Sequence, residues 1–499
     1  MLTKRHQPFF VLLKDLFTFV DCLHILITKI EILYNTMTEQ LKLKLNDSKS
    51  VRWGALVVVA FTMMAAYYVN DVVAPLKTML ETDLAWSSTD FGFFTGGYSF
   101  LNVFFLMLIW GGLILDRFGI RFTGKLSTIL MVGGTALEYY AMTGLAGADA
   151  TLFGVNEIFG YKTGVFVAFA GYSIFGVGAE VAGITVSKII AKWFRGKELA
   201  TAMGVQVALA RIGSQAGYAV AIPLARAFGI STPVLVGLIL LLGGLVAFFA
   251  FSVMDKKLDK QMEAAAIAAG TEGDEEKFSF KDVKNILGNP GFWLIALLCV
   301  LFYSCVFPFQ KFASELMIIK YGISENIAGA FAGLPALGAL ILTPVFGGFI
   351  DKRGKSASIM ILGAAMLIGV HFIYAIPFIQ YWLVAIALMI VLGIAFSLVP
   401  SAMWPAVAKI FPVSQLGTAY ALIFFIQNIG LWGIPTLIGK VLDLYCIVGK
   451  KPDGTNIYDY TIPMCIFTGI ACLSLVVAFF LKKADKKYGY GLEEANIQS

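Results

Sequence analysis

Residues 111–121 read GGLILDRFGIR, and residues 347–355 read GGFIDKRGK. Each stretch places two glycines before a short run of acidic and basic residues, and the first glycines, Gly111 and Gly347, are 236 residues apart. Either stretch alone is weak evidence, because loops that combine glycine with opposite charges are common. Their occurrence at corresponding places indicates a chain made of two similar halves, since internal repeats mark repeated structural units.

Long apolar segments surround both loops. Hydrophobic side chains make up 59% of the chain and charged ones only 14%, with a mean hydropathy of +0.81, whereas soluble domains carry about 25% charged residues. This composition excludes a soluble enzyme, because so much apolar surface needs contact with lipid. Twelve stretches reach the roughly 20 apolar residues that a membrane helix needs. We therefore expect an all-α membrane protein with twelve transmembrane helices in two six-helix, pseudo-symmetric bundles.

A charged, Ala- and Gly-rich stretch divides the twelve segments into two sets of six. The expected parts are an N-terminal segment at 1–53, a bundle at 54–254, a linker at 255–290, a second bundle at 291–481 and a tail at 482–499. Lys and Arg gather in the cytoplasmic loops of membrane proteins. With the N-terminus inside, the inner segments from residue 37 onward carry 25 of them and the outer segments 8. Both termini are therefore predicted to be cytoplasmic.

The first 36 residues are apolar but are interrupted by Lys14, Asp15, Asp21 and Lys29. Two explanations are open. The stretch can form a helix that lies in the membrane interface, or translation can begin at Met37, which opens a polar lead-in to the first membrane helix. We favour the second.

Four ionisable residues lie inside the membrane segments, namely Asp71, Glu138, Glu180 and Arg211. A charged group at the centre of a membrane helix costs at least about 2.5–3.5 kcal/mol, which makes each residue a candidate for function. Asp71 lies near the outer end of its helix and shortly before Pro75, which favours an outer gate or a cap over direct binding. Glu138 suits a helix end or a contact with a neighbouring helix better than a substrate.

Glu180 and Arg211 stand among small residues, in GVGAEVAG (176–183) and ALARIGSQ (208–215). They can form a buried ion pair that only joins two helices, or they can hold a ligand. A buried ion pair adds little net stability, because both charges lose their hydration. A purely structural role therefore explains Glu180 and Arg211 poorly. An acid that faces a guanidinium suits a zwitterion, whose ammonium would meet Glu180 and whose carboxylate would meet the fork of Arg211. We favour ligand binding.

Longer blocks around these residues resemble a known family. They are residues 171–215, which include WFRGKEL and ARIGSQ, residues 306–312 (VFPFQKF) and residues 397–430, which include QLGTAY. With the repeated loops, they resemble the major facilitator superfamily and, within it, the lysosomal dipeptide uniporters, over nearly all of 53–481. The resemblance implies two bundles that rock about a central site. It also implies that Glu180 and Arg211 hold the two termini of a peptide.

The resemblance further implies that the repeated loops form a cytoplasmic latch, in which Asp116 and Asp351 can pair with nearby bases. With the outer-gate residue, the expected gating residues are Asp71, Gly112, Asp116, Arg117, Arg121, Gly348, Asp351 and Lys352. Polar and aromatic residues near the end of the chain can line the second half of the cavity, although aromatic residues at helical spacing more often belong to a core. These candidates are Trp404, Tyr420, Gln427 and Asn428.

The predicted function is secondary transport of small zwitterionic solutes, above all dipeptides, by alternating access. Uniport is favoured over proton symport, because the first helix lacks the ExxER signature of proton-driven peptide carriers. Two alternatives stay open: an exchanger of organic anions or carboxylates, in which Arg211 is the anion site, and a non-transporting receptor. No cofactor, metal site, catalytic residue or nucleic-acid partner is expected.

The expected partners are membrane lipid and a dipeptide-like substrate, and the expected state is a monomer. An accessory subunit stays an open question. The chain has no acidic dileucine sorting signal near its N-terminus. This favours a bacterial inner membrane, with the lysosomal membrane as the location in a eukaryote.

Overall fold

The computed structural model describes residues 45–147, 150–194, 197–269, 280–452 and 454–495. The chain forms two units. The small unit comprises Met1–Ala55 and Phe249–Glu272, and the large unit comprises Leu56–Phe248 and Gly273–Ser499. The alternative start at Met37, most of the expected N-terminal segment and the centre of the expected linker lie outside the described residues.

The small unit contains η1 (Leu45–Asp47), the first turns of α2 (Lys49–Val72) and the last turns of α8 (Thr232–Ala269). The backbone N–H of Leu45 donates to Oε1 of Gln261 over 2.8 Å, which joins η1 to α8. The helix α8 continues past residue 255, where the linker was expected to begin, and α9 (Phe280–Leu287) follows the undescribed stretch.

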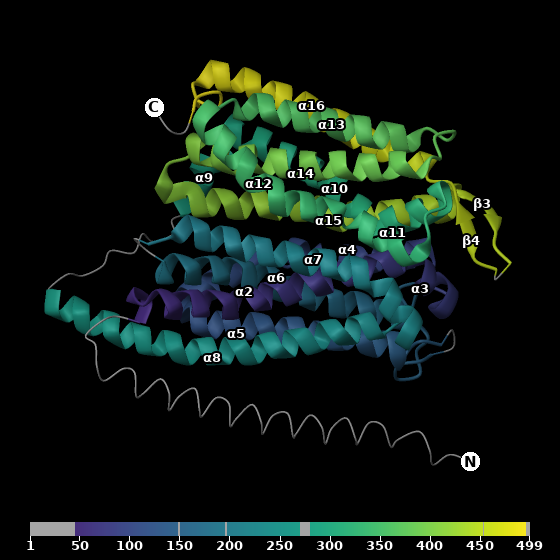
Figure 1. Cartoon of the computed structure of the whole chain (residues 1–499), viewed down its shortest axis with the longest axis horizontal. Coiled ribbons are helices and arrows are strands. Elements are labelled where there is room, and N and C mark those ends of the chain that lie inside the picture. Colours follow the sequence, from purple (N-terminus) through teal and green to yellow (C-terminus); the bar gives the residue numbers. More distant parts are fainter. Residues whose placement is uncertain (1–44, 148–149, 195–196, 270–279, 453, 496–499) are drawn as a thin grey trace, which may run out of the picture. The chain divides into compact units, whose positions relative to one another are not determined.

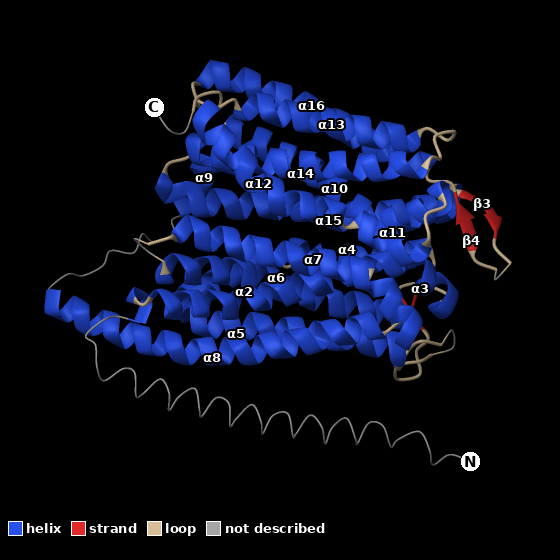
Figure 2. Cartoon of the chain, viewed as in Figure 1, coloured by secondary structure: helices blue, strands red, loops and turns tan. Residues whose placement is uncertain are grey.

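The large unit is built almost entirely of helices (Figure 2). Its long helices, besides parts of α2 and α8, are α4 (Ser88–Phe104), α5 (Met107–Thr143), α6 (Thr163–Trp193), α7 (Leu199–Phe228), α10 (Pro290–Tyr321), α12 (Leu334–Arg353), α13 (Ser356–Ala375), α14 (Trp382–Ile410), α15 (Val413–Tyr445) and α16 (Thr461–Tyr488). The short helices are η2 (Ala74–Leu76), α3 (Lys77–Leu84) and α11 (Glu325–Ala332). Among the described residues, strands occur only in two hairpins, β1 (Glu157–Ile158) with β2 (Tyr161–Lys162) and β3 (Ile447–Lys450) with β4 (Asn456–Tyr458).

The helices correspond to twelve membrane spans. In the described part of the chain, nine spans are long and apolar enough to cross a membrane singly, and α4 with α5 form a further pair bent by 59°. That pair supplies two spans, because α5 is interrupted at Gly119, whose φ of 74° and ψ of 174° are not helical. The more polar α7, which carries Arg211, is the twelfth. The predicted all-α class with two sets of six is confirmed.

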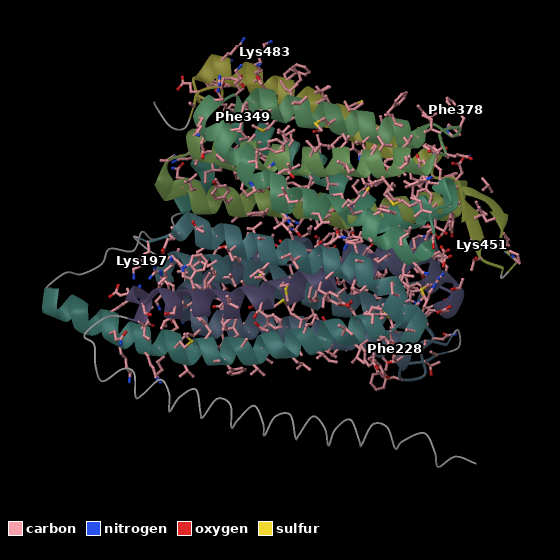
Figure 3. The ribbon with its side chains drawn as sticks, viewed as in Figure 1. Lys197, Phe228, Phe349, Phe378, Lys451 and Lys483 are labelled. Carbon is pink, nitrogen blue, oxygen red and sulfur yellow. The ribbon has the colours of Figure 1, made fainter. Side chains whose placement is uncertain are left out.

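The large unit has two ends that differ in character. The β3–β4 hairpin marks one, here called the hairpin end, and the repeated loops at 111–121 and 347–355 mark the other, here called the motif end (Figure 1). Figure 3 shows Phe228, Phe378 and Lys451 at the hairpin end, and Lys197, Phe349 and Lys483 at the motif end.

Close backbone packing joins the two halves at the hairpin end. A Cβ atom at Gly92 of α4 would lie 2.4 Å from the carbonyl oxygen of Pro435, and one at Gly439 of α15 would lie 2.2 Å from that of Ser88. Only glycine permits helices to approach so closely. At the motif end, a Cβ added at Gly112 or Gly348 would meet no atom within 4 Å in the described chain. The structure is therefore closed between its halves at the hairpin end.

Candidate substrate-binding site

Arg211 lies on α7 at the boundary between the two halves. Its neighbour Gly213 lets α2 pack closely, since a Cβ at 213 would lie 2.1 Å from the carbonyl oxygen of Met64. This approach brings the ring of Tyr67 on α2 to 5.5 Å from the guanidinium carbon. The ring of Phe396, on α14 of the other half, lies 4.9 Å from the same carbon. Both rings attract the cation through their faces.

The guanidinium of Arg211 has no hydrogen-bond or ion-pair partner among the residues that the structure describes. It carries five N–H donors in a flat fork, and aromatic faces do not satisfy donors that point outward in the plane. An unsatisfied charge in a membrane helix is costly, so such groups are usually paired or face a polar cavity. A ligand carboxylate would supply the missing acceptors.

Glu180 lies on α6, which packs tightly against α4. A Cβ at Gly176 would lie 2.0 Å from the carbonyl oxygen of Tyr98, so the glycine permits this contact. The hydroxyl of Tyr98 donates to Oε1 of Glu180 over 3.0 Å. Glu180 is half-buried, and this bond holds one carboxylate oxygen in place while the side chain keeps access to solvent.

Glu180 and Arg211 do not form an ion pair, since no nitrogen–oxygen contact within 4.0 Å joins these two described side chains. Each charge has its own aromatic neighbour instead: the ring of Tyr67 lies beside Arg211, and the hydroxyl of Tyr98 beside Glu180. The explanation that the pair only joins two helices does not fit this arrangement, because neither charge neutralises the other.

The second half presents an aromatic cluster toward Arg211. Nε1 of Trp404 donates to the hydroxyl of Tyr303 over 3.2 Å, and the hydroxyl of Tyr420 donates to the carbonyl oxygen of Trp404 over 3.0 Å. The ring of Tyr303 meets Phe396 edge-on, with centroids 6.3 Å apart. Two of the expected residues, Trp404 and Tyr420, therefore connect through Tyr303 to the ring that contacts Arg211.

The other two candidates of the second half, Gln427 and Asn428, are buried. Sγ of Cys299 lies 3.4 Å from Oε1 of Gln427, and Nδ2 of Asn428 donates to the carbonyl oxygen of Phe424 over 2.9 Å. These contacts stay within the second half. A role in lining the cavity remains a prediction for both residues.

Asp71 joins the two halves near the hairpin end. Nζ of Lys311 on α10 lies 3.1 Å from Oδ1 of Asp71, and it also donates to the carbonyl oxygen of Asn70 over 2.6 Å. The hydroxyl of Ser214 donates to the other carboxylate oxygen of Asp71. Lys311 lies inside α10 and was not among the membrane charges expected from the sequence. Its position within the apolar run VFPFQKF was the signal that could have identified it.

The expected latch residues lie at the motif end. Asp116 pairs with Lys188 of α6, with Nζ 2.9 Å from Oδ1, which is a base outside the repeated loop. The reason is that α5 and α6 pack side by side, which brings Lys188 within reach. The pair is exposed and contributes only about 0–1 kcal/mol. The remaining expected residues at this end are Gly112, Arg117, Arg121, Gly348, Asp351 and Lys352.

Sequence reasoning missed the aromatic partners of the two central charges, Tyr67, Tyr98 and Phe396. No local pattern marks them, because each lies in an apolar helix rich in aromatic residues. Glu138, by contrast, is fully buried in α5, and neither of its carboxylate oxygens has a hydrogen-bond partner in the described chain. Within the described residues, no group of three or more His, Cys, Asp or Glu could hold a metal ion.

Comparison with known proteins agrees with this architecture. A model of the Major Facilitator Superfamily matches residues 56–433. The lysosomal dipeptide transporter MFSD1 of Homo sapiens is 29% identical over 402 residues, which cover 78% of this chain and 79% of that protein. Its counterpart in Danio rerio is 26% identical over 453 residues, 88% of this chain and 89% of that one. The xylose transporter XylE from E. coli, in a partially occluded inward open conformation, shares the fold with a TM-score of 0.61 at 15% identity, over 87% of this chain and 99% of that one.

Twelve helices in two sets, with unpaired charges at their boundary, define a secondary membrane transporter of the alternating-access type. The match over most of the chain shows its family. The chain belongs to the major facilitator superfamily.

Proposed function

We propose that the chain transports dipeptide-like zwitterions, with Arg211 as the ligand of the carboxylate and Glu180 as the ligand of the ammonium. The observation that carries this proposal is the guanidinium of Arg211, which lies between two aromatic rings with its hydrogen-bond donors unused in the described structure. The similarity to proteins named lysosomal dipeptide transporters supports the same substrate class.

The separation of the two charges favours a dipeptide over a single amino acid. Glu180 and Arg211 lie on different helices, and no nitrogen–oxygen contact within 4.0 Å joins them. In a free amino acid, the ammonium and the carboxylate are attached to one carbon. A dipeptide places a peptide unit between them, which suits a site whose acid and base are held apart on separate helices.

The closed hairpin end gives the state of the carrier. The halves meet there, while Glu180 and Arg211 keep partial exposure, which favours access to them from the motif end. If both termini and the repeated loops are cytoplasmic, as the excess of Lys and Arg predicts, this is the inward-facing state. We favour uniport by a monomer in a bacterial inner membrane, or in the lysosomal membrane of a eukaryote.

The direct test is uptake of labelled dipeptides into liposomes that contain the purified chain. We expect Glu180→Gln and Arg211→Ala each to abolish uptake while the melting temperature stays close to that of the unmodified chain. Lys450→Ala and Glu157→Gln, which change exposed charges at the hairpin end, serve as controls and retain uptake. Normal uptake by both central variants would refute the proposal. Uptake that requires a dicarboxylate on the opposite side would instead support the anion exchanger.

A further inference from the structure

Three ion pairs between described residues join the halves at the hairpin end, and they differ in charge balance. Asp71 with Lys311 is one acid with one base, and so is Glu325 with Arg226. The third is not balanced. Nζ of Lys77 on α3 lies 2.7 Å from Oε2 of Glu315 on α10, and also 2.9 Å from Oε1 of Glu81, one turn further along α3. We call Lys77, Glu81 and Glu315 the gate triad.

The gate triad is shielded from solvent. The side chains of Lys77, Glu81 and Glu315 are 1%, 7% and 1% exposed. Their further contacts are neutral: the hydroxyl of Tyr460 donates to Glu315, the hydroxyl of Ser88 donates to Glu81 over 3.1 Å, and Nζ of Lys77 lies 4.6 Å from the centre of the Tyr458 ring. One ammonium therefore faces two carboxylates in a buried site.

The charged groups around the triad do not remove this imbalance. Asp443 of α15 accepts from the hydroxyl of Tyr458 over 2.9 Å and from the backbone N–H groups of Ser88 and Thr89 at the start of α4, and it adds a further acid. Asp90 belongs to the capping box of α4. Among the described residues, Lys77 is the one cation that contacts either glutamate of the triad.

We propose that the gate triad is a proton-binding site, which takes up one proton when the hairpin end closes and releases it when that end opens. A surplus charge is unfavourable in a buried site, and two carboxylates that share one site cannot both ionise easily. Oε1 of Glu315 is buried without a hydrogen-bond partner in the described structure. Such burial is less costly for an oxygen of a neutral, protonated carboxyl group than for one of a carboxylate. The proton belongs to the pair of acids rather than to one of them.

Opening of the hairpin end separates the triad, because Lys77 and Glu81 share α3 whereas Glu315 moves with the other half. The inference rests on the proposed alternating access only in assuming this separation. Water then solvates Glu315, and Lys77 with Glu81 remains a balanced pair. Since the closed state binds one more proton than the open state, acid favours closure. The ratio of closed to open molecules changes by at most about tenfold per pH unit.

The test measures closure directly in the absence of substrate. Spin labels are attached at Phe228→Cys and Phe378→Cys, which are 74% and 84% exposed and lie at the hairpin end in different halves (Figure 3). Native cysteines are replaced in the full-length chain, and the distance distribution is recorded from acid to neutral pH. We expect the short-distance population to grow as the pH falls, with the slope of one proton.

Two variants remove the surplus charge and one matched variant does not. Glu315→Gln and Glu81→Gln should each leave the hairpin end closed at every pH, so either one suffices if the other fails to fold. Glu325→Gln changes a balanced contact at the same end and should keep the pH response. Distances that do not change with pH in the parent chain, or an unchanged pH response in both triad variants, would overturn the proposal. Because no dipeptide is present, a wrong substrate assignment does not affect the outcome.

Discussion

At the scale of single residues, the shape of the guanidinium is as important as its charge. Arg211 offers a flat fork of donors that matches a carboxylate bidentately, and the rings of Tyr67 and Phe396 hold that fork by its faces. Lysine would supply the same charge as a strongly hydrated point, without the fork and with weaker stacking. An arginine at this position therefore fits the proposed binding of a planar carboxylate better than a lysine would.

Arg211→Lys is expected to lower kcat/KM for dipeptide uptake by about 10- to 150-fold, because about 1.5–3 kcal/mol of charged hydrogen bonding is lost. The melting temperature should change little, since Arg211 has no hydrogen bond to the described protein. Initial rates of uptake in liposomes measure the loss. A variant as active as the parent would show that charge alone is recognised.

Tyr98→Phe removes the hydrogen bond that positions Glu180. We expect KM for dipeptides to rise about tenfold, which corresponds to about 1.4 kcal/mol, while kcat changes less because translocation is left intact. Tyr140→Phe, at an exposed tyrosine of α5, is the matched control and should behave as the parent. A change confined to stability would mean that Tyr98 serves packing alone.

At the scale of elements, glycines allow helices of the two halves to pack closely at the hairpin end. The helices α4 and α15 meet at Gly92 and Gly439, where an added Cβ would overlap backbone atoms of the other half. The corresponding glycines of the repeated loops, Gly112 and Gly348, face open space. This open space is consistent with repeated loops that contact each other only when the hairpin end is open and the motif end is closed.

Gly439→Ala should weaken closure of the hairpin end, because its Cβ would lie 2.2 Å from the carbonyl oxygen of Ser88. Overpacking of this kind costs typically about 1–3 kcal/mol, so the closed population should fall by about 5- to 150-fold. Spin-label distances across the hairpin end measure it. Gly469→Ala, at an exposed glycine of α16 whose added Cβ meets no neighbour in the described chain, should leave these distances unchanged; an equal response from both would contradict the explanation.

The membrane helices could be predicted wherever a long apolar stretch marks them in the sequence. Apolar length identified the membrane spans, whereas the expected boundary of the linker at residue 255 falls inside α8. The break of α5 at Gly119 also falls inside the first repeated loop at 111–121. Lys311 was missed, because a charge in an apolar run cannot be told from a span boundary until its partner Asp71 on another helix is known.

At the scale of the whole molecule, ion pairs between the halves connect conformation to charge. Lys311 and Asp71 come from different halves and are about nine-tenths buried. Removing one partner of such a pair leaves an uncompensated charge, which costs about 3–5 kcal/mol, whereas removing both can be nearly neutral. The pair is therefore expected to stabilise the closed hairpin end cooperatively.

Asp71→Asn and Lys311→Gln should each lower the closed population and the melting temperature, and the double variant should recover much of both. Thermal unfolding and the spin-label distances at the hairpin end measure the two effects. Additive losses in the double variant would show that Asp71 and Lys311 act independently, for example through Ser214 and Asn70.

The central site was predictable only in part. Glu180 and Arg211 could be selected from the sequence, because charges inside membrane helices are rare and costly. The sequence could not show that these two charges do not pair with each other. Nor could it show their contacts with Tyr67, Tyr98 and Phe396, because those contacts depend on how α2, α4 and α14 pack together. The gate triad was hidden for the same reason: Glu315 lies far from Lys77 in the sequence, and only the approach of the two halves joins them.

The most direct test of the two-ended site is thermal stabilisation of the purified carrier by a series of related peptides. At about 100 times its Kd, a ligand that binds only the folded state adds about 2.7 kcal/mol of stability. Free dipeptides should stabilise the carrier, whereas N-acetylated dipeptides, dipeptide amides and dicarboxylates should not, and Arg211→Ala should lose the effect. Equal stabilisation by blocked and free dipeptides, or stabilisation by dicarboxylates alone, would contradict recognition of both termini by Glu180 and Arg211.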